Sequence, residues 1–225
     1  MAKVIHLIHL ANNMKKYIYI LIIILVVYGF VVWNNVNAAD TGANSPGTMA
    51  DDATVGTVAW SNPDRAKSLA DGNATAVLSS LGVSHYLKAT NFGFSIPTGA
   101  TIDGILAEIN KNFAGGYFPK DNSVKIVTSD GTLGSEDKAN TDNWPFGTYI
   151  SYGASNDLWN ESWSDTDIND ADFGVVISAK DTTGNTLYPI IYHIRITVYY
   201  TEAETSNPTV TIKSQTKIIG NMIIK

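Results

Sequence analysis

Five tryptophan and tyrosine side chains lie within residues 144–163, interleaved with asparagine, glycine and serine. Flat aromatic rings stack on the C–H faces of sugars while amide and carboxylate groups take the hydroxyls, so this composition suits a carbohydrate site carried on loops. The same rings could instead fill the ends of a hydrophobic core, because aromatic residues dominate core burial. The candidate carbohydrate-binding residues are Trp144, Tyr149, Tyr152, Trp159 and Trp163.

An acidic run at residues 165–172 is the second candidate site, because oxygen ligands at alternate positions could hold Ca²⁺. The run begins like an EF-hand loop, but its sixth position is Asp170 instead of glycine and its twelfth is Val176 instead of glutamate. The alternative is a solvated, capped turn before the next strand. The candidate ligands are Asp165, Asp167, Asn169, Asp170 and Asp172; no other cofactor is expected.

The remaining chemistry in the sequence is sparse. The chain has no cysteine, which excludes disulfides, thiol nucleophiles and zinc sites built on cysteine. Beyond residue 38 the only histidines are His85 and His193. No nucleophile elbow or phosphate-binding loop is present. A carboxylate pair for glycoside hydrolysis stays open, since any two acidic residues could face each other after folding.

The charge distribution argues against polyanionic partners. Residues 1–38 contain three lysines and no acidic residue, so the rest of the chain holds 12 basic and 21 acidic residues, a net charge of −9. Nucleic acid and anionic lipid both require clustered lysine and arginine. We therefore expect neither as a partner of the folded part, and a membrane contact only through the hydrophobic run at residues 17–33.

That run follows Lys15 and Lys16 and is apolar apart from Gly29. A charged segment, an apolar segment and a small-residue exit, with Val36 and Ala38 at the −3 and −1 positions, are typical of a signal peptide. At 17 residues, 17–33 is also close to the ~17 that span a bilayer. The sequence thus predicts export, with residues 1–38 either cleaved after Ala38 or kept as a signal anchor helix.

From residue 55 onward the pattern of hydrophobic residues has period 2, in short segments separated by glycine, proline and asparagine. Side chains alternate in 101–111, where Ile105, Ala107 and Ile109 share one face, and in 187–200, where Ile194, Ile196 and Val198 do. Further strands are expected at 84–91, 123–128 and 173–179. Helix is expected only as single turns, at 64–69 and in a capping box at 164–167. This pattern predicts an all-β fold, an antiparallel two-sheet β-sandwich.

The chain divides into four parts by composition. Residues 1–38 form the signal or anchor, and residues 39–54, rich in small and polar residues, are expected to be a flexible lead-in. Residues 55–200 form the sandwich domain. Residues 201–225 are expected to be a linker and an isoleucine-rich β tail, because Ile212, Ile218 and Ile224 recur every six residues, as in stacked short β-coils or in one hairpin. No closing signal follows, so a truncated chain is one of the expectations.

Three segments together resemble the jelly-roll β-sandwich modules of secreted prokaryotic proteins and phage virion proteins. They are the "FSIPTGATIDGI" entry at 94–105, the "LWNESW" segment at 158–163 and the final long strand at 194–200. The resemblance covers roughly residues 60–200. It implies a jelly-roll-like sandwich; such modules include carbohydrate-binding and structural members.

These observations favour an exported, non-enzymatic structural or adhesion module at a cell surface or outside the cell. Its partners would be glycans or other copies of surface proteins. The alternatives are a carbohydrate-binding module that uses the aromatic cluster, and a small glycan-active enzyme.

Overall fold

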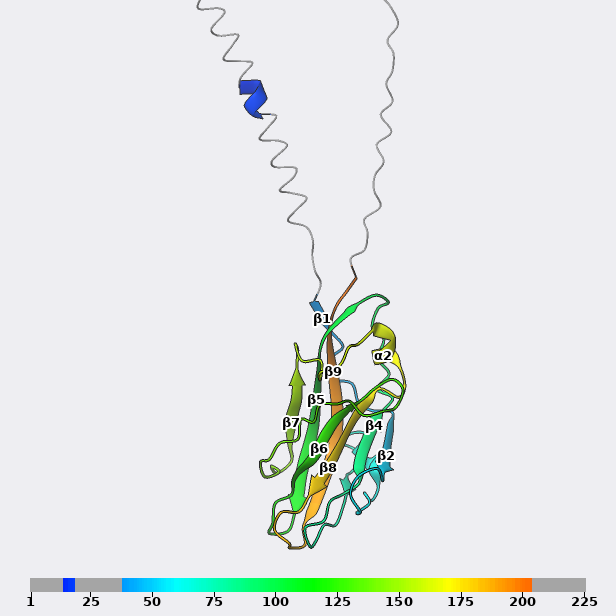
Figure 1. Ribbon diagram of the computed structural model, residues 1–225, viewed down its shortest axis with the longest axis vertical. Helices are drawn as coiled ribbons and strands as arrows, with labels where there is room; N and C mark the ends of the chain where they lie inside the picture. Colours follow the sequence, from blue (N-terminus) through cyan, green and yellow to red (C-terminus); the bar gives the residue numbers. More distant parts are fainter. Residues whose placement is uncertain (1–13, 19–37, 204–225) are drawn as a thin grey trace, which may run out of the picture.

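The computed structural model describes residues 14–18 and 38–203. Residues 38–203 form two antiparallel sheets packed face to face (Figure 1), which confirms the predicted all-β sandwich. Consecutive strands alternate between the sheets along the whole domain, so each connection crosses from one layer to the other. This alternation makes the two layers interdependent, because neither sheet contains a hairpin of consecutive strands.

The first sheet has the order β1-β9-β5-β7, and β3 also pairs with β9. Its strands are β1 (Ala38–Asp40), β3 (Ala74–Thr75), β5 (Thr101–Ala114), β7 (Thr148–Ala154) and β9 (Tyr188–Thr201). The second sheet has the order β2-β4-β8-β6. Its strands are β2 (Thr48–Asp52), β4 (Tyr86–Thr90), β6 (Lys120–Val127) and β8 (Gly174–Lys180).

The hydrophobic core lies between the two sheets and follows the predicted alternation. Ile105, Ala107 and Ile109 of β5 are fully buried, as are Ile194 and Ile196 of β9. They pack against the inner faces of β4, β6 and β8, whose core residues include Leu87, Val124, Ile126, Val175 and Ile177. The period-2 pattern therefore predicted which faces of the two longest strands point inward.

A β-bulge in β6 changes which side chains face the core. Val124 pairs with Ile177 and Ser123 with Ser178, but the next pair is Asp121 with Ala179, so Asn122 is the additional residue. A bulge places two residues opposite one and reverses the alternation beyond it. Asp121 therefore lies on the same inner face as Val124, whereas strict alternation would have placed it outside.

The helical segments are short, as the sequence predicts. A 3₁₀ turn, η1, covers Pro63–Ala66 and one α-helical turn, α2, covers Asp165–Asn169. The capping box predicted at 164–167 is present: the Ser164 hydroxyl accepts from the Asp167 amide, and the Asp167 carboxylate accepts from the Ser164 amide. No helix in the described segments is long and apolar enough to cross a membrane.

The domain boundaries differ from the prediction at the N-terminal side. Residues 39–54, expected to form a flexible lead-in, contain most of β1 and all of β2, and each of these strands adds to the edge of a different sheet. Small and polar residues can form these two strands, because an edge strand is held mainly by backbone hydrogen bonds and buries little side-chain area. In β2, Met49 is the hydrophobic residue that is buried. The predicted tail beyond residue 203 and nearly all of the 17–33 run lie outside the described residues.

Both ends of the domain lie at one pole. In β1 and β9, Ala38 pairs with Thr201, and Thr201 also pairs with Thr101 at the start of β5. At the other end of the same ladder, Ala114 pairs with Tyr188. We call these ends the terminal pole and the far pole; in Figure 1, β1 and the end of β9 lie together at the terminal pole.

We predict that Gly174→Ala destabilises the domain by about 2 kcal/mol, within the range typical of overpacked sites. A Cβ at Gly174 would overlap the backbone carbonyl oxygen of Ala89 on β4, next to Thr90, which pairs with Gly174 across the ladder. Chemical denaturation measures the change. Gly116→Ala is the control, since a Cβ there meets no atom within 4 Å. Equal unfolding free energies of the two variants would contradict the close approach of β4 and β8 at Gly174.

Candidate functional site

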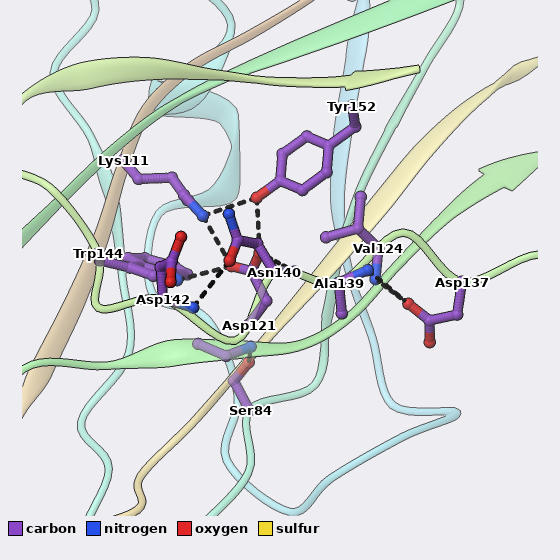
Figure 2. A network of polar contacts seen from close by, with 11 residues as sticks. Ser84, Lys111, Asp121, Val124, Asp137, Ala139, Asn140, Asp142, Trp144 and Tyr152 are labelled. Atoms are coloured by element: carbon purple, nitrogen blue, oxygen red, sulfur yellow. Dashed lines mark hydrogen bonds and ion pairs between the residues drawn. The ribbon is translucent and has the colours of Figure 1, made fainter. Parts of the chain in front are cut away.

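The carboxylate of Asp121 is completely buried and accepts four hydrogen bonds (Figure 2). Its Oδ1 accepts hydrogen bonds from Lys111 Nζ at 2.8 Å and from Trp144 Nε1 at 2.7 Å. Its Oδ2 accepts from the Tyr152 hydroxyl at 2.6 Å and from the backbone N–H of Asn140 at 2.9 Å. Lys111 Nζ also donates to the Tyr152 hydroxyl, at 2.6 Å. We call these five residues the Asp121 centre.

The centre joins both sheets. Lys111 continues the inward-facing series of Ile105, Ala107 and Ile109 on β5, and Tyr152 lies on β7 of the same sheet. Asp121 comes from β6 of the other sheet, turned inward by the bulge. Asn140 and Trp144 come from the loop that leads into β7, and the Trp144 amide donates to the Pro119 carbonyl at 3.0 Å. The centre therefore connects the two layers to this loop.

The electrostatics of the centre favour a structural role. Burial lowers the pKa of Lys111, and the attraction and hydrogen bond of Asp121 partly offset this effect. Burial, together with the neighbouring Asp121 carboxylate, raises the pKa of Tyr152. The Lys111 ammonium also lies over the rings of Trp144 and Tyr152, at 5.2 and 5.3 Å. A buried carboxylate with four donors is already fully bonded, so it offers neither a free base nor an accessible ligand.

The five predicted carbohydrate-binding aromatics do not form one site. Trp144 and Tyr152 are buried in the Asp121 centre, and Trp159 is fully buried with its Nε1 donating to the Ile105 carbonyl at 3.0 Å. Trp163 is half-buried and packs edge-on against Phe173 at 5.2 Å. Tyr149 is separate from these, on the outer face of the first sheet. Three of the five rings thus have no exposed face for a sugar, as the core-filling alternative expects.

The acidic run at 165–172 uses its side chains to fix the backbone. Asp167 accepts hydrogen bonds from Ser164 and from the Ser129 hydroxyl, and Asn169 bonds to both backbone groups of Ile96. Asp170 accepts from the Asp172 amide. No group of three or more histidine or acidic residues with the geometry of a metal site occurs among the described residues. The capped-turn alternative describes these contacts; the calcium hypothesis gains no geometric support.

A shallow open groove lies beside the Asp121 centre, lined by residues 138–141 and by part of β7. Its wall contains Asp157, which shares Lys138 with Glu136, each carboxylate lying 2.8 Å from the ammonium. Burial raises the pKa of Asp157, but the hydrogen bonds from Lys138 and from the Trp159 amide outweigh it and lower the pKa overall. A glycosidase acid needs the opposite shift. Asp157 therefore lacks the environment of a general acid.

A second polar group occupies the outer face of the first sheet. The Ser45 hydroxyl lies 2.9 Å from His193 Nε2, and the Tyr149 hydroxyl lies 2.6 Å from His193 Nδ1. Burial lowers the pKa of His193, and the nearby Arg195 guanidinium lowers it further. Triads of the serine-hydrolase type orient the histidine with a carboxylate. Here a phenol takes that position, and Glu108 instead pairs with Arg195 at 2.8 Å.

Comparison with known proteins gives little further identification. No known family model matches the chain, and no curated protein matches it. Among solved structures, the chain is similar to one described as "Structural analysis of an exo-beta-agarase", with a TM-score of 0.33 and 10% sequence identity. That match covers 67% of this chain and 23% of the other, so this protein spans less than a quarter of the agarase chain.

Sequence reasoning missed Lys111 and Asp121. For Lys111 a signal was available, because a lysine in phase with three inward-facing apolar residues indicates a buried, paired charge. For Asp121 no such signal existed, since the bulge at Asn122 reverses its direction. Exposed aromatic residues at the far pole were also missed and are described below.

We predict that Lys111→Met destabilises the domain by about 3–5 kcal/mol, because it leaves the Asp121 charge buried without its cation. Adding Asp121→Asn removes that charge and keeps one acceptor oxygen for Trp144, while the new side-chain NH2 can donate to the Tyr152 hydroxyl. The double variant should therefore lose less stability than the two single changes added together. A double-mutant cycle by chemical denaturation measures this coupling. Strictly additive losses would show that the two charges do not interact.

We predict that Asp167 contributes stability that depends on pH. Hydrogen bonds from the Ser164 and Ser129 hydroxyls lower its pKa, so its stabilisation is present above the unfolded value near ~3.9 and is lost as the pH falls through the folded-state pKa. Asp167→Asn should reduce the unfolding free energy by about 1 kcal/mol at pH 7, and this difference should shrink below about pH 4.

Unfolding free energies measured from pH 7 down to about pH 2.5 test this prediction. The matched control is Asp165→Asn in the same turn, whose carboxylate accepts no hydrogen bond from the described residues. A stability difference for Asp167→Asn that stays constant across this pH range would contradict the assignment.

Proposed function

We propose that this chain is an exported, non-enzymatic structural or adhesion module that acts at a cell surface or outside the cell. The observation that supports it most directly is the pairing of Ala38 with Thr201. The hydrophobic run at 17–33 precedes this pair by only a few residues, so a retained anchor would attach the domain at its terminal pole. The far pole would then point away from the membrane.

The polar groups of the domain support a non-enzymatic role. The Asp121 carboxylate is buried with four donors, and the two carboxylates beside the groove are both held by Lys138. The net charge of −9 beyond residue 38 and the low charged content suit a soluble exposed domain. Copies could associate through the edge strands β2, β6 and β7, which end the two sheets.

We predict that a reporter enzyme that is active only outside the cytoplasm will be active when fused after residue 225. The Ile23→Arg, Val26→Arg double variant interrupts the apolar run and is the control, because each arginine costs about 2.5–3.5 kcal/mol at a membrane centre. Loss of activity in this control is expected. Equal reporter activity with and without the two arginines, or activity in neither, would contradict export through this segment.

N-terminal sequencing of the exported product separates the two forms of the proposal. Cleavage after Ala38 would yield a chain that begins at Ala39 and keeps two of the three β1 residues. An uncleaved N-terminus in the membrane fraction would instead identify a signal anchor.

A further inference from the structure

Five aromatic side chains gather at the far pole. We call them the tip cluster: Phe113, Tyr117, Phe118, Phe146 and Tyr188. The Phe113 ring centre lies 4.7 Å from that of Phe118 and 6.2 Å from that of Phe146. Tyr188 pairs with Ala114 at the end of the β5–β9 ladder. Three segments distant in the sequence thus place their aromatic residues on one end of the domain.

These rings are unusually accessible. Phe146 is 77% exposed, Tyr117 and Phe118 are each 44% exposed, and Tyr188 is 37% exposed. The indole and phenol rings proposed from the sequence pattern are mostly buried, whereas each of these four keeps more than a third of its side chain in contact with solvent. Clustered apolar side chains left in water at one place indicate a binding surface more than isolated ones do.

The tip cluster stands on a rigid base. Phe113 and Tyr188 belong to the two longest strands. The loop that carries Tyr117 and Phe118 is joined to the loop that carries Phe146 by the hydrogen bond from the Trp144 amide to the Pro119 carbonyl. Trp144 is in turn fixed by Asp121. Rings held in place before binding lose little conformational entropy on contact with a ligand, which favours affinity.

The segments that form the tip cluster carry no charge, and the nearest charges along them, Lys120 and Asp142, are one of each sign. Residues 115–119 and 144–147 contain no charged side chain, and the nearby Lys111 and Asp121 are buried and paired with each other. Asn143, Thr148 and Thr186 are exposed beside these segments. Anionic lipid and nucleic acid would need cations here. The surface instead fits a ligand without charge that carries many hydroxyl groups.

The size of the surface also favours a small ligand. Five rings of about 200 Å² each, with roughly half of that area exposed, offer on the order of 500 Å². A stable protein–protein interface buries about 800 Å² on each partner. A few sugar units, in contrast, need only a few rings for their C–H faces and a few amide or hydroxyl groups for their own hydroxyls.

We infer that the tip cluster binds an uncharged oligosaccharide. This inference rests on the proposed adhesion function and specifies its target: a domain attached at the terminal pole would present the tip cluster to a glycan on an opposing surface. Phe146, the most exposed ring, supplies the main stacking face, and Tyr117 and Tyr188 add rings whose hydroxyls can also bond to the sugar.

The experiment uses the full chain held in amphipol and measures binding to soluble uncharged glycans: β-glucan, galactan, mannan and chitin oligosaccharides. The wild type should bind at least one of them. Phe146→Ala should weaken that binding about tenfold, as loss of one stacking ring implies. Phe146→Tyr keeps the ring and should bind like the wild type.

Leu69→Ala is the matched control, because Leu69 is a comparably exposed apolar residue (59%) outside the tip cluster. It should leave glycan binding unchanged. Equal melting temperatures would confirm that all variants fold. Absence of binding to every glycan would overturn the inference, and so would unchanged binding in a Tyr117→Ala, Phe146→Ala, Tyr188→Ala variant.

Phosphatidylcholine vesicles form the other arm. Binding to vesicles with no glycan binding would assign the tip cluster to a lipid surface and overturn the inference. The reporter fusion measures export independently, so failure of glycan binding with intact export would leave the proposed location standing and remove only this target.

Discussion

The Asp121 carboxylate is the constraint on which the arrangement of this domain depends. It holds one charge in the interior, so its four donors must stay in place to avoid the cost of an unpaired buried ion. Those donors come from the first sheet and from the loop before β7, whereas Asp121 itself belongs to the second sheet. This one group therefore adds a polar contact between the two layers to the hydrophobic core and to the connections that cross between them. In a chain without cysteine, this buried polar group thus links the two sheets where a disulfide could otherwise do so.

The two ends of the domain differ in structure. At the terminal pole, the first residue of β1 and the last of β9 pair directly, which sets where any anchor or tail must attach. At the far pole, hydrogen bonds of Trp144 link the Asp121 centre to the loops that carry Phe118 and Phe146. The long β5–β9 ladder separates these ends, so attachment at one leaves the other free to meet a partner.

Much of the fold could be predicted from the sequence because alternation records burial directly. The inward series on β5 and β9 and the capping box at Ser164 follow from local rules that the structure preserves. The edge strands β1 and β2 could not be predicted, since they are held mainly by backbone pairing. The aromatic residues show the same limit: period and composition give no indication that Trp159 is buried while Phe146 is exposed, because that depends on contacts between distant segments.

The most direct test of this account is hydrogen–deuterium exchange of the Trp144 indole N–H, followed by NMR. The account predicts slow exchange and an indole resonance shifted by its bond to a buried carboxylate, both lost in Asp121→Ala. Exchange of the Trp144 indole as fast as that of a solvent-exposed tryptophan would show that the Asp121 centre does not form, and the cross-connection between the sheets would have to be abandoned.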